Sequence, residues 1–339
     1  MVAIPLLLTA WGRGSGHASD VPPLVPPQIQ RPLELEDWPA VLEGLTGDPL
    51  TNSVVRLVAV RALFETGHLP DAQFARIHSA GPDLLSTSEL DHYAGAAYLA
   101  DALLQLGFVH AAERLAFDSL EMEGESPPAL RTLARLHLAK GLTNAAGIFL
   151  NRLEAYPEHQ AWIACLRTRT TTGSPAAGNP ELSRIQANLV TRDQVAAGLT
   201  TERLLRMALE ANPTNRMAVQ FLMAQQLLAR DLLRARQTLA GSPQTAGGPL
   251  PRHYAEAVLL HRILYPGIPV DTLLARVPPE VMADFQRLRG LLAQAKGGVE
   301  QARLAAWPEF GNTYWYYYFF GSRHSVGSSP TPDNSATHE

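Results

Sequence analysis

The chain has 339 residues, of which 46% are apolar, an ordinary proportion for a globular protein and enough for a continuous core. The net charge is −4 and no basic run is interleaved with aromatic residues, so the sequence lacks the pattern typical of nucleic-acid binding. Cys165 is the only cysteine, which excludes an intrachain disulfide.

Residues 1–20 contain a short apolar run from Val2 to Trp11. The run has only half of the roughly 20 residues that a helix needs to cross a bilayer. Small residues at Gly16 and Ala18 fit a signal peptide, although no Lys or Arg precedes the run. The remnant of a transmembrane helix fits equally well, and a buried strand or helix is the simplest alternative. The first two interpretations favour an extracytoplasmic or membrane-associated location over the cytoplasm.

Residues 21–34 are predicted to be a proline-rich linker. Five prolines between Val21 and Pro32 favour extended polyproline II structure and argue against a helix. The sequence therefore predicts a stiff spacer, with helices beginning near Glu36. Recognition by a proline-binding domain is a less favoured alternative.

Residues 35–169 carry the clearest internal repeat. Gly107 and Gly141 lie 34 residues apart, the length of one tetratricopeptide (TPR) helix-turn-helix unit. Ala112 and Ala146 each follow their glycine by five residues. Further apolar and small residues recur at the same offset: Leu99/Leu133, Ala100/Ala134, Leu104/Leu138 and Ala111/Ala145. Alanine lets paired helices approach closely and glycine tolerates positive φ at a helix end, so stacked helical hairpins are expected.

Weaker signals extend this pattern. The run from Ser53 to Thr66 ends at Gly67 and is interpreted as a degenerate repeat. Asp91 and Ser126 are suitable N-cap residues for the helices that follow them. Cys165 lies in an apolar stretch and is expected to be a small buried hydrophobic residue.

Residues 181–320 are predicted to hold further helical repeats. Ala208 and Ala235 lie 27 positions apart, where the TPR pattern has small residues, and Pro213 marks a helix stop. Arg230 stands where the pattern has a glycine, so the match is weaker there.

The remaining segments of the second half have no repeat motif. Residues 170–180 lack periodicity and are predicted to form a loop between two halves of the chain. Helices are expected at about 253–264 and 279–295, as one more hairpin. Residues 321–339 are rich in Ser, Pro, Thr and Asn and are predicted to be a disordered tail.

Residues 314–320 form an uninterrupted aromatic run, Tyr-Trp-Tyr-Tyr-Tyr-Phe-Phe. The favoured interpretation is a cap that covers the apolar face of the last repeat. The alternative is a surface for a partner or a membrane interface, since Tyr and Trp favour such boundaries. The candidate contact residues in that case are Tyr314, Trp315, Tyr317 and Tyr318.

No catalytic, cofactor-binding or metal-binding motif is found in the sequence. His253 and His261 lie eight residues apart on one predicted helix, without the acidic residue that would complete a zinc motif. Surface positions or satisfied interior positions account better for the scattered histidines. The sequence therefore predicts a protein that is not an enzyme and needs no cofactor.

Three segments in combination resemble the soluble C-terminal half of an uncharacterised bacterial membrane-protein family. They run from Asn215 to Ala224, from Pro251 to Ala257 and from Gly311 to Tyr317. In that family a multi-spanning membrane region precedes a TPR-like region. The resemblance covers roughly residues 35–320 and implies a TPR-like fold, but no activity and no catalytic residue. The membrane spans are missing here, which suits the interpretation of residues 1–20 as a remnant.

The sequence as a whole predicts an all-α fold, a TPR-like α-solenoid of antiparallel helical hairpins with an aromatic C-terminal cap. The expected function is a non-enzymatic scaffold that binds an unknown protein or peptide in a concave groove. The alternative is a soluble accessory region of a multi-spanning enzyme or transporter, with peripheral or N-terminal membrane association. A truncated gene product without a retained role is a third possibility.

Overall fold

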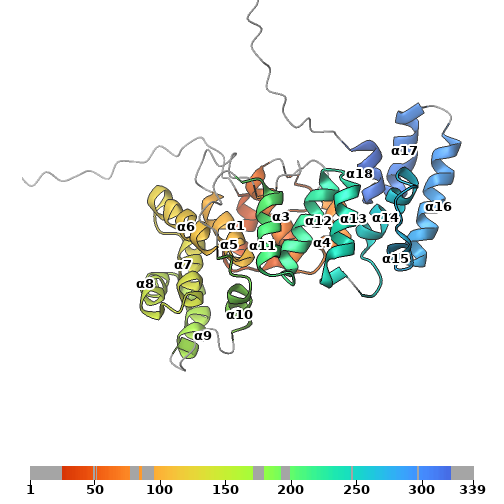
Figure 1. Ribbon diagram of the computed structural model, residues 1–339. Coiled ribbons are helices and arrows are strands. Elements are labelled where there is room, and N and C mark those ends of the chain that lie inside the picture. Colours follow the sequence, from red (N-terminus) through yellow and green to blue (C-terminus); the bar gives the residue numbers. More distant parts are fainter. Residues whose placement is uncertain are drawn as a thin grey trace, which may run out of the picture.

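The computed structural model describes residues 25–48, 50, 52–76, 84–85, 95–170, 179–191, 199–245, 247–295 and 298–321. All regular structure in these residues is helical, as the sequence predicts (Figure 1). The expected signal peptide or membrane remnant at 1–20, the N-cap at Asp91, most of the loop at 170–180 and the tail after Gly321 lie outside the described residues.

The first half of the chain runs from α1 to α9. Its helices are α1 (Pro27–Glu34), α2 (Trp38–Gly44), α3 (Ser53–Glu65), α4 (Leu69–Arg76), α5 (Ala96–Leu106), α6 (Val109–Glu123), α7 (Pro127–Ala139), α8 (Thr143–Leu153), the 3₁₀ turn η2 (Pro157–His159) and α9 (Gln160–Thr170). Helices α5 and α6 pack together, as do α7 and α8, and α3, α5 and α7 contact one another in that order.

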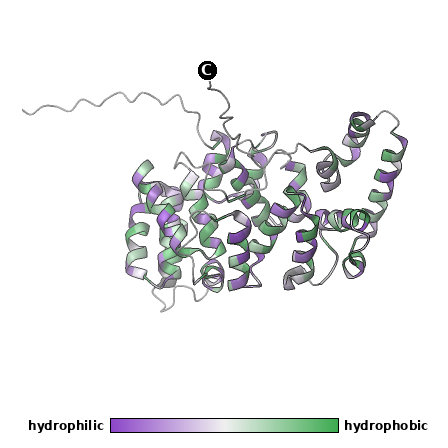
Figure 2. Ribbon diagram, turned by 45° about the horizontal axis from the view of Figure 1, so that its top comes forward, coloured by the Kyte–Doolittle hydropathy of each residue, from purple (hydrophilic) through white to green (hydrophobic). Residues whose placement is uncertain are grey.

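The second half runs from α10 to α18. Its helices are α10 (Pro180–Ala187), α11 (Thr201–Ala211), α12 (Arg216–Leu228), α13 (Leu232–Gly241), the 3₁₀ turn η3 (Pro243–Thr245), α14 (Arg252–Leu264), α15 (Asp271–Leu274), α16 (Pro279–Gln294), α17 (Gly298–Phe310) and α18 (Tyr314–Phe320). One cluster of buried apolar side chains extends from α1 to α18. Figure 2 shows hydrophobic and hydrophilic residues alternating along most helices, as expected where one side of each helix is buried.

The glycines of the repeat have the backbone conformation that the sequence predicts. Gly107 ends α5 with a φ of 101°, and Gly141 follows α7 with a φ of 75°. Ala112 and Ala146 are fully buried, so a small methyl group lies where the two helices of each pair pack together. In the second half Ala208 and Ala235 are buried as well.

The order of the helices in space differs from their order in the chain. Helix α10 contacts α5 and α7, and α12 then packs against α3, α4 and α5. Helix α14 also contacts α4. The second half therefore continues from the α3–α4 hairpin and not from α9, so that α8 and α16 lie at opposite ends of the molecule (Figure 1). The helices are therefore not stacked in chain order at this junction.

The proline-rich linker predicted over 21–34 is wrong for its second part, because α1 is a helix. Pro27 occupies the first turn, where no N–H is needed. Pro32 removes one intrahelical hydrogen bond, but Ile29 is fully buried and Leu33 nearly so. Packing of these two side chains outweighs the loss of one hydrogen bond.

Two smaller expectations also need correction. Cys165 is exposed, because α9 uses Ile163 and Leu166 as its buried side. Ser126 does precede α7 as the N-cap residue, but its side chain makes no capping hydrogen bond.

The aromatic run forms α18, which packs against α14 and α17. Tyr314 and Trp315 are fully buried, and Tyr317 is 5% exposed. The ring of Phe74 in α4 lies 5.1 Å from that of Tyr314 and 4.9 Å from that of Tyr317. Helix α18 thus lies on the inner side of α16 and α17 (Figure 1). Of the four candidate contact residues only Tyr318 is partly exposed, so the other three side chains are not accessible to a partner.

None of the helices in the described residues combines the length and the apolar character that crossing a bilayer requires.

Candidate functional site

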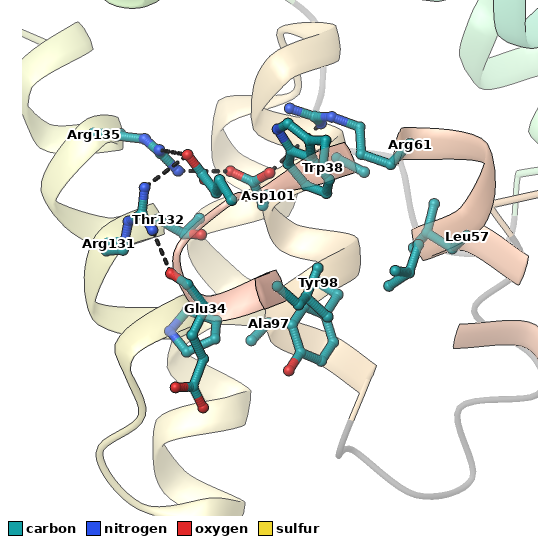
Figure 3. A pocket seen from close by; sticks show the side chains of 15 residues that line it. Glu34, Trp38, Leu57, Arg61, Ala97, Tyr98, Asp101, Arg131, Thr132 and Arg135 are labelled. Atoms are coloured by element: carbon teal, nitrogen blue, oxygen red, sulfur yellow. Dashed lines mark hydrogen bonds and ion pairs between the residues drawn. The ribbon is translucent and has the colours of Figure 1, made fainter. Parts of the chain in front are cut away.

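A pocket of about 40 Å³ opens between α3, α5, α7 and the segment that joins α1 to α2 (Figure 3). We call it the arginine pocket, because Arg61, Arg131 and Arg135 line it and are only 2–6% exposed. Arg131 and Arg135 are four residues apart on α7 and therefore project from the same face of that helix. Three guanidinium groups are thus held in a largely apolar setting, where each needs a counter-charge.

Carboxylates supply that counter-charge, and two of them, Glu36 and Asp101, each pair with two of the arginines. Glu181 adds a further ion pair, with its Oε1 3.0 Å from Arg135 Nε. Glu36 Oε2 lies 2.7 Å from Arg131 Nη2 and 2.6 Å from Arg135 Nη2. Asp101 in α5 links α7 to α3. Its Oδ1 lies 3.2 Å from Arg135 Nη1, and its Oδ2 lies 3.5 Å from Arg61 Nη1. In Figure 3 Arg135 points from α7 toward Asp101, Arg61 reaches Asp101 from α3, and Arg131 is hydrogen-bonded to the backbone carbonyl of Glu34. The ion pairs therefore tie α3, α5 and α7 to the turn after α1.

Glu36 is ionised over the ordinary pH range. Burial alone would raise its pKa, but the charges of Arg135 and Arg131 outweigh burial and lower the pKa to about 2. Its φ is 57°, a left-handed conformation that is uncommon for a residue with a Cβ.

Aromatic and unpaired polar groups complete the arginine pocket. The Trp162 ring lies 4.9 Å from the Arg131 guanidinium carbon and 5.3 Å from that of Arg135. Arg131 Nε and the hydroxyl of the fully buried Thr132 have no hydrogen-bond partner in the described part of the chain. Burial, together with the charges of Glu34 and Glu123, raises the pKa of Tyr98 to about 12. The pocket therefore retains polar groups that a ligand or water could satisfy.

A second and larger pocket lies between α3, α5, α10 and α12. We call it the amide pocket, because amide side chains dominate its lining, and its volume is about 330 Å³. The lining residues are Phe64, Glu65, Gln105, Arg184, Ala187, Asn188, Asn212, Thr214, Asn215, Arg216 and Met217. A volume above about 300 Å³ falls in the range of ligand-binding pockets.

Hydrogen bonds fix the wall of the amide pocket. Asn188 Nδ2 donates to the Gln105 carbonyl at 3.0 Å, and Asn212 Nδ2 donates to Asn188 Oδ1 at 2.8 Å. Asn215 Nδ2 donates to the Leu106 carbonyl at 3.2 Å, and its Oδ1 caps α12 by accepting from Ala218 N. The amides thereby join the end of α5 to the ends of α10 and α11 and to the start of α12.

The two pockets adjoin each other through Glu65. Its Oε1 lies 2.8 Å from Arg61 Nη2, on the side of the arginine pocket. The same oxygen lies 4.0 Å from Arg184 Nη2, on the side of the amide pocket. We call the two neighbouring pockets together, with the side chains of α3, α5, α7, α10 and α12 that line them, the polar trough.

A comparison with protein families matches residues 28–321 to a family of unknown function, DUF6057. The chain belongs to the DUF6057 family. The match spans almost the range over which the sequence resembles an uncharacterised family, and it contains every residue of the polar trough. Neither the curated proteins nor the solved structures gave a match to this DUF6057 chain.

The histidines considered as ligands lie elsewhere in the DUF6057 chain. His253 is fully buried, and its Nδ1 lies 3.0 Å from Glu256 Oε2 while its Nε2 accepts from Phe74 N at 3.4 Å. His261 is buried, and neither of its ring nitrogens has a hydrogen-bond partner among the residues that the structure describes. The described residues contain no group of three or more His, Cys, Asp or Glu side chains that could hold a metal ion.

Apart from Asn215, Arg216 and Met217, which lie in one of the segments that carry the family resemblance, the residues of the polar trough were not singled out in the sequence. The repeat glycines lie at helix ends and the repeat alanines lie buried within helices. Of these residues, Gly107 lies against the backbone of Asn188, which lines the amide pocket. One signal could have indicated the arginine pocket. Arg131 and Arg135 interrupt the apolar helix α7 at a spacing of four, which places two cations on a helix that is almost entirely buried.

Proposed function

We propose that this DUF6057 chain is a non-enzymatic scaffold that binds a peptide segment or a helix of another protein in the polar trough. In this proposal the helical hairpins stack in a TPR-like arrangement, with the order of the two halves described above. The trough would take the place of the concave groove expected from the sequence.

The observation that carries the proposal is that two adjoining pockets are lined by side chains from five helices far apart in the chain. The amide pocket offers about 330 Å³ of space beside fixed amide groups. A peptide backbone presents one donor and one acceptor per residue, and amide and guanidinium groups can pair with both. Surfaces assembled from successive hairpins are suited to extended ligands.

The test is selection of peptides by the full chain, followed by affinity measurements on a pocket-filling variant. Ala187 is exposed and lines the amide pocket, so Ala187→Trp would fill the pocket with little effect on stability. Ala240 is also exposed and helical but lies outside the trough, which makes Ala240→Trp the matched control. We expect the affinity of selected peptides, read by fluorescence anisotropy, to fall about tenfold or more for Ala187→Trp only. Equal affinities for both variants, or no selected peptide, would contradict the proposal.

A further inference from the structure

We propose that the amide pocket binds a carboxylate of the bound segment between Arg184 and Arg216. The carboxylate would come from an acidic side chain or from a C-terminus. This inference rests on the proposed function and specifies the chemistry of the ligand.

Arg216 is a guanidinium with unused donors at the edge of the amide pocket. Its side chain is exposed, and it makes no ion pair with any residue that the structure describes. Its guanidinium carbon lies 5.4 Å from the centre of the Phe64 ring. An aromatic ring against the face of a guanidinium orients the group and leaves the N–H donors at its edge free. Such an edge matches the two oxygens of a carboxylate.

Arg184 is the second cation of the amide pocket. Its Nη2 donates to Gln105 Oε1 at 2.8 Å, which orients the side chain without neutralising its charge. Glu65 lies 4.0 Å away, and its nearest oxygen is already 2.8 Å from Arg61. Arg184 therefore lacks a close carboxylate of its own within the described part of the chain.

The charges along the trough are distributed unevenly. Arg61, Arg131 and Arg135 in the arginine pocket are paired with three carboxylates, those of Glu36, Asp101 and Glu181. The amide pocket has two guanidiniums and a single carboxylate, Glu65, which is bound to an arginine of the other pocket. The surplus positive charge is thus confined to the larger pocket, which is the place where an added anion lowers the electrostatic energy.

The experiment uses the full chain and two random decapeptide libraries, one with free and one with amidated C-termini. The variants are Arg184→Gln and Arg216→Gln. Arg203→Gln is the control, because Arg203 is exposed on α11 and its ion pair in the described residues is with the exposed Glu210. Circular dichroism checks that each variant is folded.

We expect selected peptides to be enriched in Asp and Glu, with affinity reduced about tenfold in each pocket variant and unchanged in the control. Enrichment in the amidated library identifies a side-chain carboxylate, and binding restricted to free C-termini identifies a terminal one. Selected peptides without acidic preference, or with equal affinity for Arg216→Gln and Arg203→Gln, would overturn the carboxylate inference and leave peptide binding in place.

A second probe separates failure of the inference from failure of the proposed function. Titration with N-acetyl-aspartate, followed by NMR of the arginine Nε–H signals, reads the pocket without any peptide. Shifts at the arginine signals that disappear in Arg216→Gln would support the carboxylate site even if no peptide is selected. No shift at either arginine would overturn it.

Discussion

At the scale of single residues, Glu36 combines an unfavourable backbone conformation with a favourable charge. Its N–H donates to the Leu33 carbonyl at 3.2 Å and so closes the end of α1 with a φ of 57°. The left-handed conformation costs a residue with a Cβ roughly 1–2 kcal/mol. Glycine would avoid this cost, but it would leave Arg131 and Arg135 without their shared carboxylate.

We predict that Glu36→Gln lowers the free energy of unfolding by about 2 kcal/mol at pH 7, because two buried guanidiniums lose the carboxylate that they share. The pKa of Glu36 is lowered to about 2 in the folded chain from an ordinary value of 4.5. The carboxylate therefore contributes its full stabilisation at pH values above about 4.5. This stabilisation is lost as the pH falls from about 4.5 toward 2. The difference between the wild type and the variant should therefore shrink over that range.

Urea denaturation at constant ionic strength, followed by circular dichroism at several pH values, measures this difference. Glu43→Gln is the control, because Glu43 is exposed on α2. A difference between the wild type and Glu36→Gln that stays constant from pH 7 to 2 would show that the ion pairs do not contribute as we describe.

Arg230, just after the end of α12, also combines a left-handed backbone conformation with favourable side-chain contacts. The repeat pattern has a glycine at this position, and Arg230 adopts the conformation of that glycine, with a φ of 57°. Its Nη2 donates to the carbonyls of Tyr317 and Gly321 at 3.0 and 2.7 Å. The departure from the repeat pattern is thus explained by a long-range contact to the end of α18, which no local pattern could reveal.

At the scale of helices, Gly107 and Gly141 have similar backbone conformations in different surroundings. A Cβ on Gly107 would lie 1.8 Å from the Asn188 carbonyl oxygen, whereas a Cβ on Gly141 would meet no atom within 4 Å. The carbonyl of Gly107 also accepts a hydrogen bond from Val190 N at 3.0 Å. Gly107 therefore ends α5 and also brings the segment after α10 against it.

We predict that Gly141→Ala costs roughly 1–2 kcal/mol, the penalty of left-handed backbone alone. Gly107→Ala should cost at least about 3 kcal/mol, because the backbone near Asn188 must also move. Urea denaturation measures both values, and each variant serves as the control for the other. Equal losses would mean that the contact between Gly107 and Asn188 does not constrain the fold.

The helices were predictable from the sequence where local chemistry decides them. The ends of α3, α5 and α7 follow from glycines, and most of the later helices begin and end close to the expected residues. Helix α1 was missed because its stability depends on burial of Ile29 and Leu33 and not on the propensity of its prolines. Cys165 was misassigned because a short apolar stretch does not indicate which side of a helix is buried.

At the scale of the whole molecule, the arrangement of the two halves could not be predicted. It depends on contacts between distant residues, such as the hydrogen bond from Gln73 Nε2 to the Ala224 carbonyl at 3.1 Å. The polar trough shares this property. The side chains of its amide pocket come from helices that meet only because α10 and α12 return to the first half, so spacing along the chain carries no signal for that pocket.

Phe74 lies at the junction of the two halves and allows a test of this arrangement. It is fully buried in α4, and its ring lies 5.0 Å from that of His253 in α14. It also contacts Tyr314 and Tyr317 in α18. Phe74→Ala should therefore reduce the free energy of unfolding by about 3–5 kcal/mol.

We predict that this loss is concentrated in the second half, because α14 and α18 lose a shared contact with α4. Hydrogen exchange read by mass spectrometry should show that Phe74→Ala increases the exchange rate, relative to the wild type, more in α14 and α18 than in α7 and α8. Phe149→Ala is the control at the other end of the molecule, where the partly buried Phe149 stacks on His137. Phe149→Ala should increase the exchange rate more in α7 and α8 than in α14 and α18. If Phe74→Ala increases exchange equally in both halves, the junction is not a separate cooperative unit; if exchange in α14 and α18 is unchanged, α4 does not hold the second half in place.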